Sequence, residues 1–144
     1  MTARLGRGVA CGLAVSLSAW APAIAETLSP LQPPVATADR SQALTAVAVD
    51  FPPGDRARPH RHGEAVVFAY VLRGEVRSQI EGEPARTYRA GESWVERPGA
   101  HHVLTDNQSR TRPARLLVVF AAPSGAPLKS DDPSPDANFG GKAQ

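Results

Sequence analysis

The sequence predicts a single-domain, all-β protein of the sandwich or barrel type. Short apolar segments of strand length follow one another between residues 43 and 122. Turn-forming residues separate these segments at intervals of about 8 to 12 residues, and no segment shows the period of a helix. The chain has 144 residues, which is enough for one domain with a buried core.

The predicted strands follow from local alternation and from the turns that end them. The first spans residues 43–51, where the sequence Pro52-Pro53-Gly54-Asp55 stops it. Further strands are expected at residues 64–72, 75–80, 86–89, 93–96, 101–105 and 115–122. The turns between them contain Arg73-Gly74, Glu81-Gly82-Glu83-Pro84 and Asp106-Asn107-Gln108-Ser109.

The segments on either side of these strands are not expected to contribute to a core. Residues 26–42 contain three prolines and no clear period, which predicts an extended, Pro-rich lead-in. Residues 123–144 consist largely of Pro, Gly, Ser and Asp, which predicts a mostly disordered C-terminal tail with Leu128 as a candidate anchor. The predicted β-domain therefore covers residues 43–122.

Residues 1–25 have the features of a secretory signal peptide. Arg4 and Arg7 precede an apolar run, and the small-residue triplet Ala23-Ile24-Ala25 predicts cleavage after Ala25. The alternative is an N-terminal membrane anchor, but the run is shorter than the roughly 18 to 20 residues that a spanning helix needs. We therefore expect a periplasmic or secreted protein with no stable membrane span after cleavage.

Removal of this segment changes the charge and the redox chemistry of the chain. It contains two arginines and no acids, so the remaining chain has 14 basic and 14 acidic residues and no net charge. A neutral chain gives no support for nucleic-acid binding. The only cysteine, Cys11, lies in the predicted signal, so thiol chemistry and cysteine ligation are excluded from the mature protein.

The histidines occur in two blocks of the sequence. On an extended strand, side chains two residues apart point to the same face, so His60 and His62 could hold one metal ion. Taken alone, this block fits an exposed basic loop equally well, because Arg56 and Arg58 flank it. The second block contains His101 and His102, which are adjacent and face opposite sides, so only one can join the pair.

The two blocks resemble the two motifs of small single-domain cupins, whose fold is a double-stranded β-helix, or jelly roll. The first motif runs Gly, five residues, His-x-His, a Glu and a later Gly. The second runs Gly, five residues, Pro-x-Gly, two residues, His and a later Asn. The residues in register with the two motifs are Gly54, His60, His62 and Gly74 for the first, and Gly91, Gly99 and His102 for the second.

The resemblance implies one divalent transition metal (Fe, Mn, Ni, Cu or Zn) bound by His60, His62 and His102 at the mouth of the barrel. It also implies a homodimer and a small-molecule ligand or substrate. The chemistry of the residues agrees, since neutral imidazole binds such metals and three nitrogens leave coordination positions open.

The chain departs from the motifs at three positions. The place of the family's glutamate ligand is Val67, or Val66 with the shorter spacing, so this carboxylate is absent. Arg97 stands at the proline position and Asp106 at the asparagine position. A site with three histidines and no carboxylate would be more electropositive, and could bind an anionic substrate.

Five further residues are candidates for an extra ligand or for the pocket. Glu64 lies two residues after His62 and would share its face on a regular strand, so it could replace the missing carboxylate. His101 is expected at the rim. The remaining candidates are Tyr70, Gln79 and Trp94, each of which could equally be a packing or surface residue.

These observations favour an exported, metal-binding cupin with a small-molecule site. One interpretation is a dioxygenase-like oxidoreductase in which the metal acts as a Lewis acid. The alternative is a non-enzymatic cupin that binds a sugar or an anion and has lost its full metal chemistry, and a weaker one is a periplasmic metal carrier. Motifs for nucleophilic hydrolases, phosphate-binding loops and dinucleotide binding are absent from the sequence.

Overall fold

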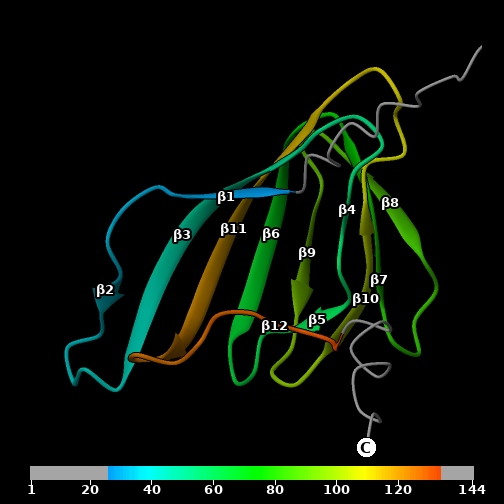
Figure 1. Ribbon diagram of the computed structural model, residues 1–144. Helices are drawn as coiled ribbons and strands as arrows, with labels where there is room; N and C mark the ends of the chain where they lie inside the picture. The colour runs from blue at the N-terminus through cyan, green and yellow to red at the C-terminus, as the bar shows by residue number, and fades with distance from the viewer. Residues whose placement is uncertain (1–25, 134–144) are drawn as a thin grey trace, which may run out of the picture.

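The computed structural model of the protein describes residues 26–133, which form twelve β-strands and no helix (Figure 1). This confirms the predicted all-β fold. The strands are β1 (Thr27–Pro30), β2 (Val35–Ala36), β3 (Gln42–Phe51), β4 (Arg56–Ala57), β5 (His60–Arg61), β6 (Val66–Arg73), β7 (Glu75–Ile80), β8 (Arg86–Arg89), β9 (Ser93–Glu96), β10 (His101–Asp106), β11 (Ala114–Pro123) and β12 (Ser130–Asp131).

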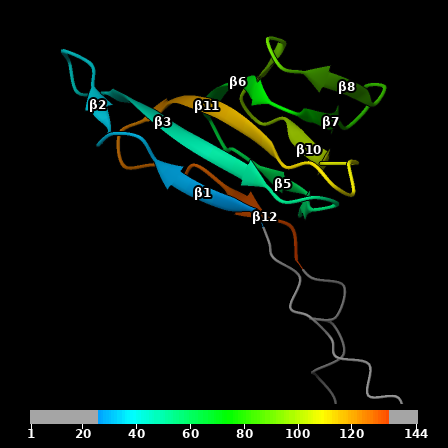
Figure 2. The same cartoon turned by 90° about the horizontal axis from the view of Figure 1, so that it is seen from above.

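The strands form two antiparallel sheets. The first sheet has the order β1-β3-β11-β6-β9, with β2 also paired to β3, and the second has the order β12-β5-β10-β7-β8, with β4 also paired to β10. Seen from above, β1, β3 and β11 lie in one layer and β7, β8 and β10 in another (Figure 2). Most neighbours in a sheet are distant in sequence, so the domain is closed by long-range pairing.

The core follows from strict alternation along the strands. In β11, every second side chain is buried, among them Leu116, Val118 and Phe120. In β6, Val67 and Ala69 are buried while their neighbours in sequence are not. Because side chains alternate between the faces of a sheet, these residues line the space between the two sheets.

The outer face of β6 and β9 carries apolar side chains that no described residue covers. Val66, Phe68, Leu72 and Val95 are between 39% and 59% exposed. Exposed apolar patches of this kind often mark contacts with another protein. The expected homodimer remains a prediction.

The turn between β6 and β7 requires glycine at position 74. Gly74 has a positive φ of 74°, and a Cβ there would lie 2.7 Å from the carbonyl oxygen of Pro113. A larger residue would therefore be strained by both its backbone and its contacts. This explains why glycine stands at the end of the first motif.

The segments expected to flank the domain add strands to its edges. β1 and β2 pair with β3, and β12 pairs with β5, so parts of residues 26–42 and 123–133 are joined to the sheets. The predicted signal peptide and the end of the predicted tail, residues 134–144, lie outside the described residues. Within the described range, there is no helix that could cross a membrane.

Candidate metal centre

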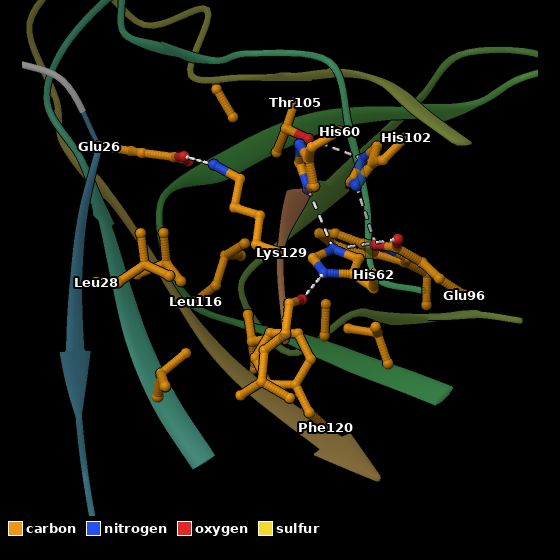
Figure 3. Close-up of a pocket in the computed structure, with 18 of the residues that line it drawn as sticks. Glu26, Leu28, His60, His62, Glu96, His102, Thr105, Leu116, Phe120 and Lys129 are labelled. Atoms are coloured by element: carbon orange, nitrogen blue, oxygen red, sulfur yellow. Dashed lines mark hydrogen bonds and ion pairs between the residues drawn. The ribbon is translucent and has the colours of Figure 1, made fainter. Parts of the chain in front are cut away.

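Three buried histidines meet between the sheets. His60 lies on β5 and His102 lies opposite it on β10, while His62 follows β5 directly. His60, His62 and His102 are 5%, 9% and 3% exposed, respectively, and each offers a ring nitrogen within 4.8 Å of the others (Figure 3). The structure thus brings together the three histidines that the sequence singled out as ligands.

Backbone carbonyls fix the protonation of His60 and His62. The Nδ1 atom of His60 lies 2.6 Å from the carbonyl oxygen of Arg58, and that of His62 lies 2.5 Å from the carbonyl oxygen of Leu128. A carbonyl can only accept, so each Nδ1 donates its hydrogen. In the neutral rings, each Nε2 then presents a lone pair, which is the form that binds a metal.

These two lone pairs face each other. The Nε2 atoms of His60 and His62 are 3.1 Å apart. Burial lowers the pKa of His60 to about 4, with further lowering by the neighbouring imidazoles, so this ring is neutral at pH 7. Two acceptors at this distance in a buried site require a cation between them, either a proton or a metal ion.

His102 is held from the other side. Its Nε2 atom lies 2.8 Å from the hydroxyl groups of both Ser78 and Thr105. This leaves the Nδ1 atom to face the cluster and Glu96 (Figure 3). Hydrogen bonds to the far nitrogen of a ligating imidazole fix its orientation, so the two hydroxyl groups prepare His102 for ligation.

A buried carboxylate completes the polar end of the cavity. Glu96, on β9, is 3% exposed, and its Oε1 atom accepts a hydrogen bond of 3.0 Å from the Trp94 indole. The same oxygen lies 3.0 Å from His102 Nδ1, and Oε2 lies 3.6 Å from His62 Nε2. His102 Nδ1 and Glu96 Oε2 are buried without a hydrogen-bond partner among the described residues.

The surroundings favour the ionised form of Glu96. Burial raises the pKa of this carboxyl, but the interactions with His102, with the Trp94 indole and with His62 outweigh it. The net effect holds the pKa of Glu96 below its ordinary value. A metal ion therefore fits this donor set, because two unpartnered buried atoms and two facing lone pairs converge in one place.

The rest of the cavity is apolar. It has a volume of about 100 Å³ and is lined by side chains from β3, β6 and β11. Since a buried water needs about 10 to 15 Å³ by this measure, the space suits a metal ion with several waters or a small organic molecule. At its rim, Lys129 forms an ion pair with Glu26, and both line the cavity (Figure 3).

His101 points away from this cluster, as expected for a neighbour of His102. Its Nε2 atom lies 2.8 Å from a carboxylate oxygen of Asp132, and its Nδ1 atom lies 3.4 Å from one of Glu81. Its side chain is 15% exposed. His101 thus contacts the C-terminal segment beside β12 rather than the cavity.

Of the other sequence candidates, the structure brings only Trp94 into the cavity. Glu64 is exposed in the turn at Gly63, which breaks the strand and its alternation after His62. Tyr70 takes the outward position between two buried residues of β6. Gln79 is partly exposed and donates to the carbonyl of Glu83. These three residues therefore lie outside the site.

Sequence reasoning missed the carboxylate and the hydroxyl groups that support the histidines. Ser78, Thr105 and Glu96 were not among the candidates, although all three are buried beside the cluster. One local signal was present. Glu96 has the same parity on its strand as Trp94, so a strand that buries the tryptophan must also bury the carboxylate.

A family model described as the cupin domain matches residues 47–120 of the chain. This range contains both histidine blocks and all the strands from β4 to β10. It covers just over half of the chain. No curated protein matches the chain by sequence.

The chain is similar in fold to solved structures, two of which are described as having a double-stranded β-helix. An oxalate oxidase in complex with the substrate analogue glycolate has a TM-score of 0.56 and 25% identity, over 72% of this chain and 53% of its own. A DMSP lyase from Ruegeria pomeroyi has a TM-score of 0.53 and 26% identity, over 60% and 42%. A protein from Thermus thermophilus has a TM-score of 0.55 and 26% identity, over 69% and 84%. The chain thus spans about half the length of the two enzymes.

Proposed function

The chain belongs to the cupin family, and we propose that it binds one divalent transition metal through His60, His62 and His102. The facing Nε2 atoms of His60 and His62, 3.1 Å apart, carry this proposal. The carbonyls of Arg58 and Leu128 hold both rings in the tautomer that ligates, so the protein is already arranged for the ion.

We further propose that the site serves a small molecule, as in a dioxygenase-like oxidoreductase. A bound metal would supply Lewis-acid chemistry and, if redox-active, a platform for O2. The chain's own residues would hold the ion, and the apolar wall formed by Leu116, Val118 and Phe120 would exclude bulk water from the substrate. The similarity to an oxalate oxidase supports an oxidoreductase, and that to a DMSP lyase shows that the fold also serves lyases.

The metal site can be tested with the double variant His60→Ala/His62→Ala. It should retain the β-sheet circular-dichroism spectrum of the wild type but lose bound metal, because two of three nitrogen ligands are gone. His101→Ala is the matched control, since it removes a histidine outside the cluster and should leave metal content unchanged. Equal metal content in the double variant and the wild type would refute the assignment.

The reaction class can be tested by oxygen uptake after reconstitution with Fe²⁺, Mn²⁺, Ni²⁺ or Cu²⁺. We expect O2 consumption with at least one member of a panel of small catechols, flavonols and dicarboxylates. The cavity of about 100 Å³ favours the smaller members. Binding without turnover, seen as a raised melting temperature but no O2 uptake, would replace the oxidoreductase with a non-enzymatic binding protein.

That second function has one observation in its favour. The position of the family's glutamate is occupied by Val67, which is 1% exposed and lines the cavity. An apolar residue there is compatible with a cupin that binds a sugar or an anion and no longer performs metal chemistry. The same panel of ligands separates the two functions.

Export to the periplasm or beyond remains a proposal based on residues 1–25. Mass spectrometry of the protein from an extracellular or periplasmic fraction should give a chain that begins at Glu26. An intact N-terminus in the cytoplasmic fraction would contradict it.

A further inference from the structure

We propose that Glu96, on β9, supplies the carboxylate ligand of the metal. The neighbouring strand β6 has a valine, Val67, at the position of the family's glutamate. This inference rests on the proposed metal site and adds a fourth ligand to the three histidines. Glu96 does not occupy any histidine or glutamate position of the two motifs. Four features of the structure support it.

The first feature is the register of the first sheet. Val67 on β6 lies directly opposite Glu96 on β9. Both residues are buried and both line the cavity. Side chains directly opposite on antiparallel strands have their Cβ atoms about 4.5 to 5.5 Å apart. A glutamate on β9 can therefore reach the place that a glutamate at position 67 would serve.

The second feature is the spacing of the donor atoms. His60 Nε2 lies 3.1 Å from His62 Nε2, which lies 3.6 Å from Glu96 Oε2, and Glu96 Oε1 lies 3.0 Å from His102 Nδ1. With metal–ligand bonds of about 2.1 Å, adjacent ligand atoms are separated by about 3.0 Å in an octahedron and about 3.4 Å in a tetrahedron. These three distances are close to the edges of such a polyhedron, and the ligand atoms of the three histidines all lie within 4.8 Å of one another.

The third feature is the unpartnered state of the carboxylate. The Trp94 indole satisfies Oε1, but Oε2 is buried without a hydrogen-bond partner among the described residues. A buried carboxylate oxygen without a partner is costly. The nearest nitrogen is His62 Nε2, which presents its lone pair as a ligand. A metal ion bound by both His62 Nε2 and Glu96 Oε2 would therefore give each of these buried atoms a partner.

The fourth feature is charge. Three neutral imidazoles would leave a divalent ion with its full charge in a largely apolar cavity, which is unfavourable. One carboxylate halves this charge and adds an oxygen to the nitrogen donors, a mixed set that suits Fe²⁺ and Mn²⁺. The site is then less electropositive than expected from the motif alone, and an anionic substrate is not needed to neutralise it.

Glu96→Gln tests this role with little change in volume, because the amide oxygen can still accept from Trp94. We expect the Kd for Mn²⁺ to rise about 100-fold or more, above the 10- to 100-fold typical of residues that only orient ligands. Glu64→Gln is the matched control, since Glu64 is exposed and should leave the Kd unchanged. Both variants should retain the wild-type circular-dichroism spectrum.

A crystal structure of the Mn²⁺- or Zn²⁺-loaded wild type separates ligation from orientation. A Glu96 oxygen about 2.0 to 2.2 Å from the ion supports the inference. A carboxylate more than 3 Å from the ion, held only against His102, overturns it. If the wild type binds one ion and Glu96→Gln binds it equally well, only the role of Glu96 fails, whereas a wild type that binds no ion refutes the proposed metal site itself.

Discussion

The polar end and the apolar wall of the cavity differ in the contacts that hold their side chains in place. At the polar end, each histidine has a hydrogen-bond partner within 2.8 Å on the nitrogen that faces away from the cluster. The wall on β3 and β11 contains no such contacts, and side chains such as Val49, Leu116 and Val118 are held only by packing. Both ends are equally buried.

This difference shows where specificity and stability reside. Hydrogen bonds have a fixed direction, so the polar end can hold donor atoms at ligand spacing before an ion binds. Packing against apolar neighbours has no direction, so the wall sets the size of the cavity and contributes to the free energy of unfolding. Substitutions at the two ends should therefore affect different measurements.

The largest effects on metal content and on the free energy of unfolding are expected from two single variants, one at each end of the cavity. His62→Ala should lose bound metal and leave the free energy of unfolding of the metal-free protein close to that of the wild type. Leu116→Ala should lower that free energy by about 2 to 3 kcal/mol, because it deletes a buried side chain, and keep one metal per chain. Denaturant titration and metal analysis of both variants check this. Loss of metal in Leu116→Ala would contradict the claim that the apolar wall contributes to stability but not to metal binding.

Smaller effects are expected from the hydroxyl groups behind His102. Thr105→Val and Ser78→Ala each remove one of two hydrogen-bond partners of Nε2. Metal affinity should fall about 10-fold for each, and further in the double variant, because the ring is less well oriented. Competition with a chelator of known affinity measures the change. Unchanged affinity in the double variant would show that packing alone orients His102.

The smallest effect is expected at the rim, where Lys129 pairs with Glu26 and Asp131. Its charge is one of the causes that lower the pKa of His60, so it also opposes a cation in the cavity. Lys129→Gln should tighten metal binding by less than about tenfold, since partly exposed charges are screened by solvent. The same chelator competition applies. Weaker binding would mean that Lys129 stabilises the site in another way.

The fold could be predicted from local alternation and turn residues, and the three histidines from their match to the two cupin motifs. Alternation along a strand places His60 and His62 on one face, and the glycines fix where the strands end. The burial of Glu96 follows from its parity with Trp94, but its approach to the histidines depends on the pairing of β9 with β6, which are far apart in sequence. The edge strands β1, β2 and β12 escaped prediction for the same reason.

Glu64 shows the limit of alternation. It has the parity of His62, but Gly63 adopts a positive φ of 58° and begins a turn. The chain leaves the sheet there, so the rule for strands no longer applies. Alternation therefore offered Glu64 only as a candidate carboxylate, and the structure places the buried carboxylate of Glu96 on β9, which pairs with β6.

Metal analysis of the protein from Glu26 onward, purified without a histidine tag, tests the central claim most directly. A variant in which His60, His62 and His102 are all alanine provides the comparison. We predict about one transition-metal ion per wild-type chain, as purified or after reconstitution, and none in the variant. A wild type that takes up no metal, or a variant that retains it, would contradict the assignment of the three histidines.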